Sequence, residues 1–140
     1  MKRHPSQQNE LFSSAVETHG NLVFDLCCEM LGNELQAEVI WLSVFRDIHK
    51  YQEQDIPKEL VRPWILQKVY AQLLLKSLPN SSPLRSLPSH PRDRLILLLR
   101  DKYGLPYSEI ASALSIPESS IKLVRAQAFR ELEENMAYQL

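Results

Sequence analysis

Glycine is scarce in this chain, with three residues in 140, and runs of β-branched residues are few. Both features favour helices over sheet. Cysteine occurs only as the adjacent pair Cys27 and Cys28. Neighbouring residues of a helix diverge by about 100°, which excludes a disulfide framework or a metal-ligand set built on this pair. We expect buried thiols in a reducing cytosol.

An excess of charge of one sign is also missing, since 16 basic and 17 acidic residues give a formal net charge of -1. Proteins that coat nucleic acid are usually clearly basic, so any contact with nucleic acid must be local or shared with a partner that supplies charge. No apolar run approaches the ~20 residues of a membrane span, and the polar start lacks the apolar core of a signal peptide. We expect a soluble, cytoplasmic protein.

Motifs of enzymes are absent as well. The four histidines, His4, His19, His49 and His90, have no paired spacing with carboxylates or thiols. The chain has no glycine-rich phosphate loop and no nucleophile elbow. The sequence therefore predicts a protein that is not an enzyme, with no metal site, no catalytic residue and no cofactor.

What the chain does contain is helical periodicity in two blocks, with 44% apolar residues to form cores. The segment SLPNSSPLRSLPSHP between the blocks is rich in proline and serine and has no periodicity, as in a semi-extended linker. We predict an all-α fold of two small helical domains. The predicted boundaries are a flexible tail 1–9, a first domain 10–77, a linker 78–90 and a second domain 91–140.

In the first domain, Gly20 is expected to break or bend the first helical stretch. Gly32 suits a left-handed C-terminal cap, and Asn33 suits the N-cap of a helix over 34–50. The expected core face of that helix is Ala37, Ile40, Trp41, Val44, Phe45 and Ile48. Val39 and Leu42 fall on the expected solvent face of that helix. They are either scattered exposed apolar residues, which are normal, or part of a patch that binds a partner.

The next segment, 51–59, is polar and is expected to be a loop. Pro63 suits the first turn of the helix that follows, which extends to about Ser77. That helix is apolar almost all round, so it is either central to a bundle or covered by another chain.

In the second domain, a helix over 92–103 is expected to end at Gly104. A short helix from Pro106 packs through Ile110, Ala111 and Leu114, and the turn Ser115-Ile116-Pro117 leads into a last helix. The last helix packs through Ile121, Val124, Ala128 and Leu132. This pattern predicts a helix-turn-helix, whose second helix enters the major groove of DNA. Its predicted DNA-binding residues are Ser119, Ser120, Lys122, Leu123, Arg125 and Ala126, although its basic residues also fit a solvated helix face.

Two segments carry a resemblance to a known family. GLPYSEIASALSIPESSIKLVRAQAF, at 104–129, aligns without gaps to a typical "GLSYEEIAEILGIPVGTVKSRLHRAR". MLGNELQAEVIWLSVFRDIH, at 30–49, aligns likewise to "LLGDPADAEDLVQEVFLRAW". The chain thus resembles bacterial RNA polymerase sigma factors of the extracytoplasmic-function group. The resemblance implies a region two that binds core polymerase and opens the −10 element, and a region four that reads the −35 element.

The departures from the family pattern concern both domains. Val39, Leu42 and Ser43 replace polar residues with which the family binds the polymerase clamp, and of that set only Glu38 remains. In the last region-two helix, the DNA-facing positions are held by Gln67, Tyr70, Ala71 and Leu75. In the recognition helix, Val124, Gln127 and Phe129 stand where arginines are expected. Ser115 replaces the turn glycine, so it must adopt a left-handed conformation or a different turn.

Three functions follow from this pattern. The first is a divergent sigma factor, in which Glu38 and Phe45 contact the polymerase clamp and the last helix binds promoter DNA, weakly when alone. The second is a sigma-like regulator that has lost promoter opening and binds an anti-sigma factor, a second copy or another regulator. The third is a helix-turn-helix regulator whose first domain only dimerises it. The predicted partner-binding residues are Glu38, Val39, Leu42, Ser43, Phe45, Tyr70, Ala71 and Leu75.

Overall fold

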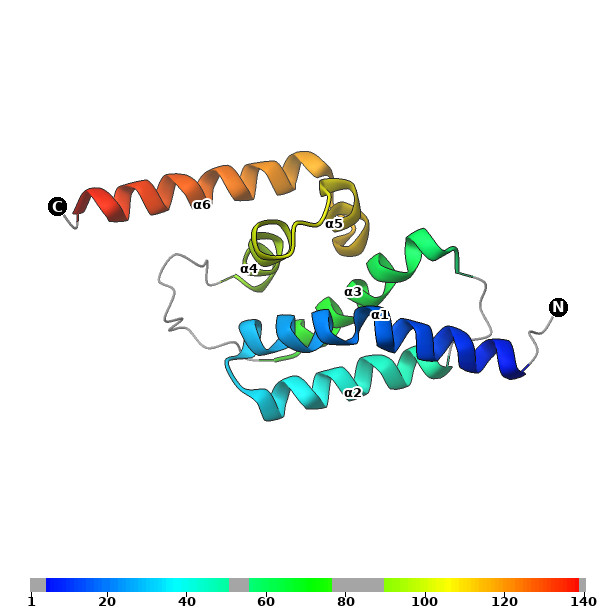
Figure 1. The fold of residues 1–140 in the computed structure, drawn as a ribbon. Helices are drawn as coiled ribbons and strands as arrows, with labels where there is room; N and C mark the ends of the chain where they lie inside the picture. The colour runs from blue at the N-terminus through cyan, green and yellow to red at the C-terminus, as the bar shows by residue number, and fades with distance from the viewer. Residues whose placement is uncertain (1–4, 51–55, 77–89, 139–140) are drawn as a thin grey trace. The chain divides into compact units, whose positions relative to one another are not determined.

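The computed structural model describes residues 5–50, 56–76 and 90–138, and in these ranges the chain is helical with no strand (Figure 1). It divides into two compact units, Met1–Lys76 and Ser77–Leu140. The all-α prediction is confirmed. Most of the predicted loop at 51–59 and nearly all of the predicted linker lie outside the described residues. None of the described helices is long and apolar enough to cross a membrane.

Unit 1 begins with one continuous helix, α1 (Pro5–Leu31). The predicted tail is therefore wrong for residues 5–9, since Pro5 suits the first helical position, where its missing N–H needs no partner. The predicted break at Gly20 is also wrong. The Gly20 carbonyl accepts a hydrogen bond of 3.0 Å from Trp41 Nε1, and packing of α1 against α2 outweighs the low helix propensity of glycine.

Replacing Gly20 with alanine is expected to raise the free energy of unfolding by about 1 kcal/mol, the usual difference in helix propensity. A Cβ atom at this position would lie 3.6 Å from both Trp41 Cζ2 and Val16 Cγ1, an ordinary contact that requires no rearrangement. Urea denaturation monitored by circular dichroism measures the change. The matched control is Gly32→Ala, which should destabilise because Gly32 has a φ of 66°. A loss of stability in Gly20→Ala would show that the added Cβ atom does not fit between Val16 and Trp41.

The second helix, α2 (Glu34–Lys50), has the predicted bounds. Gly32 is left-handed, as predicted, and Asn33 Oδ1 accepts hydrogen bonds from the N–H groups of Leu35 at 2.9 Å and Gln36 at 3.1 Å. This is the predicted N-cap. The predicted core face is buried except for Trp41, which is half-buried; the buried residues are Ala37, Ile40, Val44, Phe45 and Ile48.

The third helix, α3 (Lys58–Leu74), begins earlier than predicted. Pro63 lies inside it and is buried, because a proline this close to the start removes only one backbone bond while its ring joins the core. Of the two alternatives predicted for this helix, a central place in a bundle is wrong for α3, and cover by another chain stays a prediction. One side is buried, whereas the other exposes apolar side chains, including Leu60 and Leu74.

The two thiols belong to α1. Cys27 is fully buried, as predicted, whereas Cys28 is only half-buried. Burial, with a smaller contribution from the neighbouring Cys28, raises the pKa of Cys27 to about 12. The Cys27 thiol therefore stays protonated and behaves as a small apolar core residue.

Unit 2 contains α4 (Pro91–Leu97), the π-helical turn η1 (Leu98–Lys102), α5 (Tyr107–Leu114) and α6 (Glu118–Tyr138). The helix predicted over 92–103 is thus α4 followed by η1. It begins at His90, whose Nδ1 accepts a hydrogen bond of 3.2 Å from the Arg92 N–H. It ends as predicted at Gly104, which has a φ of 69° and closes on the Arg100 carbonyl at 3.1 Å.

Candidate nucleic-acid interface

The turn between α5 and α6 is tight and left-handed. Ser115 has φ 56° and ψ 45°, as expected if it takes the place of a turn glycine. The Ile116 N–H closes the end of α5 on the Ala111 carbonyl at 3.1 Å, and α6 begins at Glu118. The predicted helix-turn-helix is therefore formed, with a non-glycine residue at the position that demands a positive φ.

Ser115→Gly is expected to stabilise unit 2 by about 1 kcal/mol, because glycine adopts the left-handed region without the steric penalty of a Cβ atom. Thermal unfolding of unit 2, followed by circular dichroism, gives the measurement. Ser115→Val is the matched control and should lower stability, since a β-branched residue is strained at positive φ. Equal stability of the glycine and serine forms would show that the serine hydroxyl offsets the backbone strain.

Packing of α5 on α6 holds the motif together. The buried residues of the two helices are Ile110, Ala113, Leu114, Ile121 and Val124. The prediction is corrected at Ala111, which is half-buried while Ala113 takes the core position, and at Leu132, which is exposed. Val124 is buried, so it replaces an expected arginine as a core residue rather than as a contact with DNA.

The outer side of α6 carries the predicted DNA-binding residues. Ser119, Lys122, Leu123 and Ala126 are exposed, and Ser120 and Arg125 are half-buried. Leu123 is the most apolar of these positions and is 59% exposed. Four of the six predicted residues thus present a continuous exposed surface on the first turns of α6.

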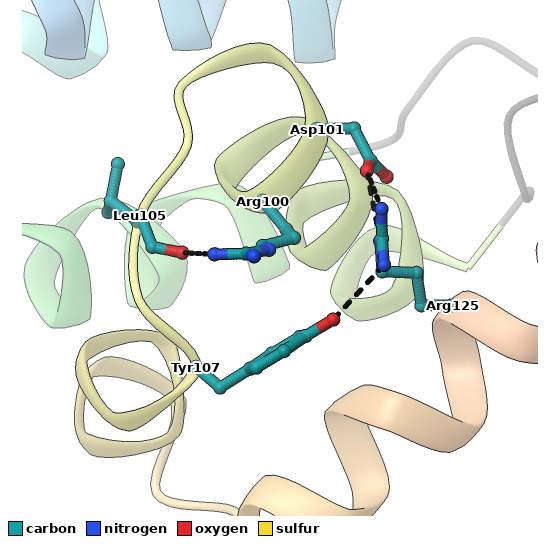
Figure 2. A network of polar contacts seen from close by, with 5 residues as sticks. All are labelled: Arg100, Asp101, Leu105, Tyr107 and Arg125. Atoms are coloured by element: carbon teal, nitrogen blue, oxygen red, sulfur yellow. Dashed lines mark hydrogen bonds and ion pairs between the residues drawn. The ribbon is translucent and has the colours of Figure 1, made fainter.

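The Arg125 side chain points toward Asp101 and Tyr107 (Figure 2). Its Nε and Nη2 atoms donate to Asp101 Oδ1 at 2.9 and 2.7 Å, and its Nη1 donates to the Tyr107 hydroxyl at 3.1 Å. The hydrogen bond to Asp101 is the main cause that raises the pKa of Arg125 above its ordinary value. We call Arg125, Asp101 and Tyr107 the Arg125 network; it ties α6 to η1 and to the start of α5.

The Tyr107 ring lies among three cationic side chains. The Arg100 guanidinium stacks over the ring at 4.5 Å, and Lys122 Nζ lies 5.7 Å from the ring centre. Arg100 also donates from Nη1 to the Leu105 carbonyl at 3.0 Å, as Figure 2 shows. Such contacts orient the cations through the negative face of the ring. Three basic side chains, Arg100, Lys122 and Arg125, therefore converge here beside the carboxylate of Asp101.

Sequence reasoning missed Arg100, Asp101 and Tyr107 as parts of this site. Arg100 and Asp101 both lie in η1, and π-helical turns often occur at functional positions. No glycine or proline marks the turn from α-helix to π-helix, so the sequence offers no local cue. The contacts of Arg125 span 24 residues to Asp101 and 18 to Tyr107, distances along the chain that helical periodicity does not reach.

Phe129 also has a place that the sequence did not predict. It lines an apolar pocket of about 310 Å³ within unit 2, together with Leu97, Leu98, Asp101, Lys102, Ala128 and Leu132. The Arg125 guanidinium lies 4.9 Å from the Phe129 ring centre. Phe129 therefore stands where an arginine is expected, but it faces the α4–η1 side of α6.

The predicted partner-binding residues lie in unit 1 on two helices. On α2, Glu38, Val39 and Leu42 are exposed and Ser43 is half-buried, but Phe45 is only 2% exposed. The Phe45 ring lies 4.6 Å from that of Trp41. The partner-binding prediction for Phe45 is therefore wrong, whereas its predicted place on the core face of the helix is confirmed. The other predicted residues are accessible. On α3, Tyr70 is half-buried and Ala71 is exposed, and Leu75, directly after α3, is exposed.

Residues 90–132 match the family model of sigma-70, region 4. This segment is similar to region 4 of sigma factors. The match runs from the N-cap of α4 into α6, so it includes the helix-turn-helix and the whole Arg125 network. Region 4 is a DNA-binding module of transcription initiation and not an enzyme family. No curated protein matches the chain. Among the residues that the structure describes, no group of three or more His, Cys, Asp or Glu could hold a metal ion.

Proposed function

We propose that the protein is a sigma-factor-like transcription protein that associates with core RNA polymerase and reads promoter DNA through region 4. The observation that carries the proposal is a matched region 4 with a formed helix-turn-helix and an exposed outer face on α6. The resemblance of residues 30–49 to region two supports the assignment of unit 1 to core polymerase and of the chain to the extracytoplasmic-function group.

The residues of α6 take different roles in this proposal. Ser119, Ser120, Leu123 and Ala126 face base edges and sugars in the major groove, where small and apolar side chains contact the thymine methyl group. Lys122 neutralises a backbone phosphate. Arg125 holds α6 in place through Asp101 and Tyr107, and it is a positioning residue. With so few phosphate contacts, binding to DNA alone is weak and depends on polymerase to bring region 4 to the promoter.

Co-purification with core polymerase, followed by run-off transcription, tests the proposal. We expect association at low salt and transcripts that depend on the added protein. The control is the same protein with Lys122→Ala and Ser119→Ala, which should keep the association but lose promoter selection. Failure to associate with core polymerase, combined with no DNA shift at ~50 mM salt, would rule the proposal out.

A second function is favoured by the exposed apolar residues of α2. Val39 and Leu42 are 58% and 46% exposed, which suits a protein partner better than a polar clamp contact. In this case the protein is a sigma-like regulator that has lost promoter opening. Association with core polymerase without any transcript in the run-off assay would favour this function over the first.

A further inference from the structure

Three apolar side chains of α2 form a row on the side of the helix opposite its buried face. Leu35, Val39 and Leu42 are 76%, 58% and 46% exposed, and we call them the outer stripe. Their spacing of four and then three residues aligns them along one side of the helix. This is the spacing with which helices of a coiled coil meet. A row of this kind fits a helix of another chain better than water.

The exposed charges of α2 change sign along the helix. Glu34 and Glu38 lie in its amino-terminal half, and Arg46 and Lys50 lie in its carboxy-terminal part, all of them exposed, with the half-buried Asp47 beside Arg46. Two α2 helices in antiparallel orientation would place each acidic end beside a basic end, and twofold symmetry repeats the match. A parallel pair would bring like charges together. The charge pattern of α2 is therefore complementary to itself in one orientation.

We propose that two copies of this chain associate through an antiparallel pair of α2 helices centred on Leu42. Glu38 and Arg46 lie one turn before and one turn after Leu42, so this register sets Glu38 level with Arg46 of the second copy. The aliphatic part of that arginine covers Val39 while its guanidinium reaches the carboxylate. A single pair of helices buries little surface, so the dimer is weak and forms at micromolar concentrations or above. The proposal is independent of DNA binding by region 4.

Sedimentation equilibrium of the full chain over a range of concentrations tests the dimer. The double variant Val39→Asp with Leu42→Asp should weaken dimerisation at least about a hundredfold, because it buries two unpaired carboxylates per chain in the contact. Both positions are exposed in the single chain, so the variant should keep the helical circular dichroism of the parent. The matched control is Leu74→Asp on α3, where the side chain is 52% exposed and dimerisation should be unchanged.

A charge exchange tests the orientation and register. Glu38→Arg and Arg46→Glu should each weaken self-association, because each puts like charges at the same level. An equimolar mixture of the two variants should form a heterodimer, since one chain then carries only basic and the other only acidic side chains at these two levels. The proposal is overturned if the parent chain stays monomeric at ~0.5 mM, above the micromolar range expected. It is also overturned if Leu74→Asp disrupts the dimer while the outer-stripe variant does not, or if the mixture fails to pair.

Discussion

Ile121→Ala is expected to lower the free energy of unfolding of unit 2 by about 3 kcal/mol, within the range measured for truncation of fully buried isoleucines. Ile121 is completely buried in the first turn of α6, where α6 packs against α5. A unit of this size has a small core and little stability to lose. Loss of this side chain should therefore leave a large fraction of unit 2 unfolded and abolish its binding to DNA.

The distribution of tryptophan lets one experiment follow the two units separately. Both tryptophans, Trp41 and Trp64, belong to unit 1. In urea, the tryptophan fluorescence transition of Ile121→Ala should coincide with that of the parent chain, while circular dichroism should lose part of its amplitude at lower urea. The control is Leu123→Ala, at an exposed position of the same helix, which should change stability by no more than ~0.5 kcal/mol. A parallel shift of both transitions would show that the units unfold together.

Lys122→Ala and Arg125→Ala are expected to affect DNA binding in different ways, although both remove one positive charge from α6. Each neutralised phosphate contributes a slope of about −0.9 to the dependence of log K on log salt concentration. Lys122→Ala should reduce the slope by about this amount. Over a fourfold change in salt, one phosphate contact corresponds to about a three- to fourfold difference in affinity. Arg125→Ala should leave the slope unchanged and weaken binding by a similar factor at every salt concentration.

Arg125→Ala should leave the salt slope unchanged because Arg125 already bonds to Asp101 and to the Tyr107 hydroxyl. Asp101→Asn removes the negative charge that holds Arg125. The orientation of α6 should then be less fixed, and DNA binding should weaken as a result. Combining Asp101→Asn with Arg125→Ala should add little to either single change, since both act on one contact. Salt titrations by fluorescence anisotropy supply the slopes. A reduced slope in Arg125→Ala would mean that Arg125 leaves Asp101 and contacts a phosphate itself.

Several elements of the fold were predicted correctly because their causes are local. The left-handed Gly32, the Asn33 cap and the bounds of α2 depend on a few neighbouring residues and on helical periodicity. The helix-turn-helix is of the same kind, since Gly104 and the turn at Ser115 lie within one short segment. The same local rules misjudged Gly20 and Pro63. In both cases a helix-breaking residue is kept inside a helix by packing, which local propensity does not include.

The residues of the candidate sites also fall into those that local sequence patterns predict and those that they do not. The exposure of Val39, Leu42 and Lys122 could be predicted, because a helix with a strong apolar face must turn its opposite side to solvent. The burial of Phe45 follows from the same periodicity, because this residue lies on the predicted core face. The contact of Arg125 with Asp101 could not be predicted. Arg125 finds its carboxylate on a π-helical turn far away along the chain.

By itself, the sequence determined that this protein is helical and that its second unit contains a helix-turn-helix, because caps, turns and helical periodicity act over a few residues. Only the tertiary structure decided that, of Lys122 and Arg125, it is Lys122 that remains available to DNA. That choice depends on η1 bringing Asp101 to Arg125, while Lys122 rests above the Tyr107 ring and stays exposed. A long flexible side chain takes the partner that packing places within its reach, and packing joins residues that are remote in the sequence.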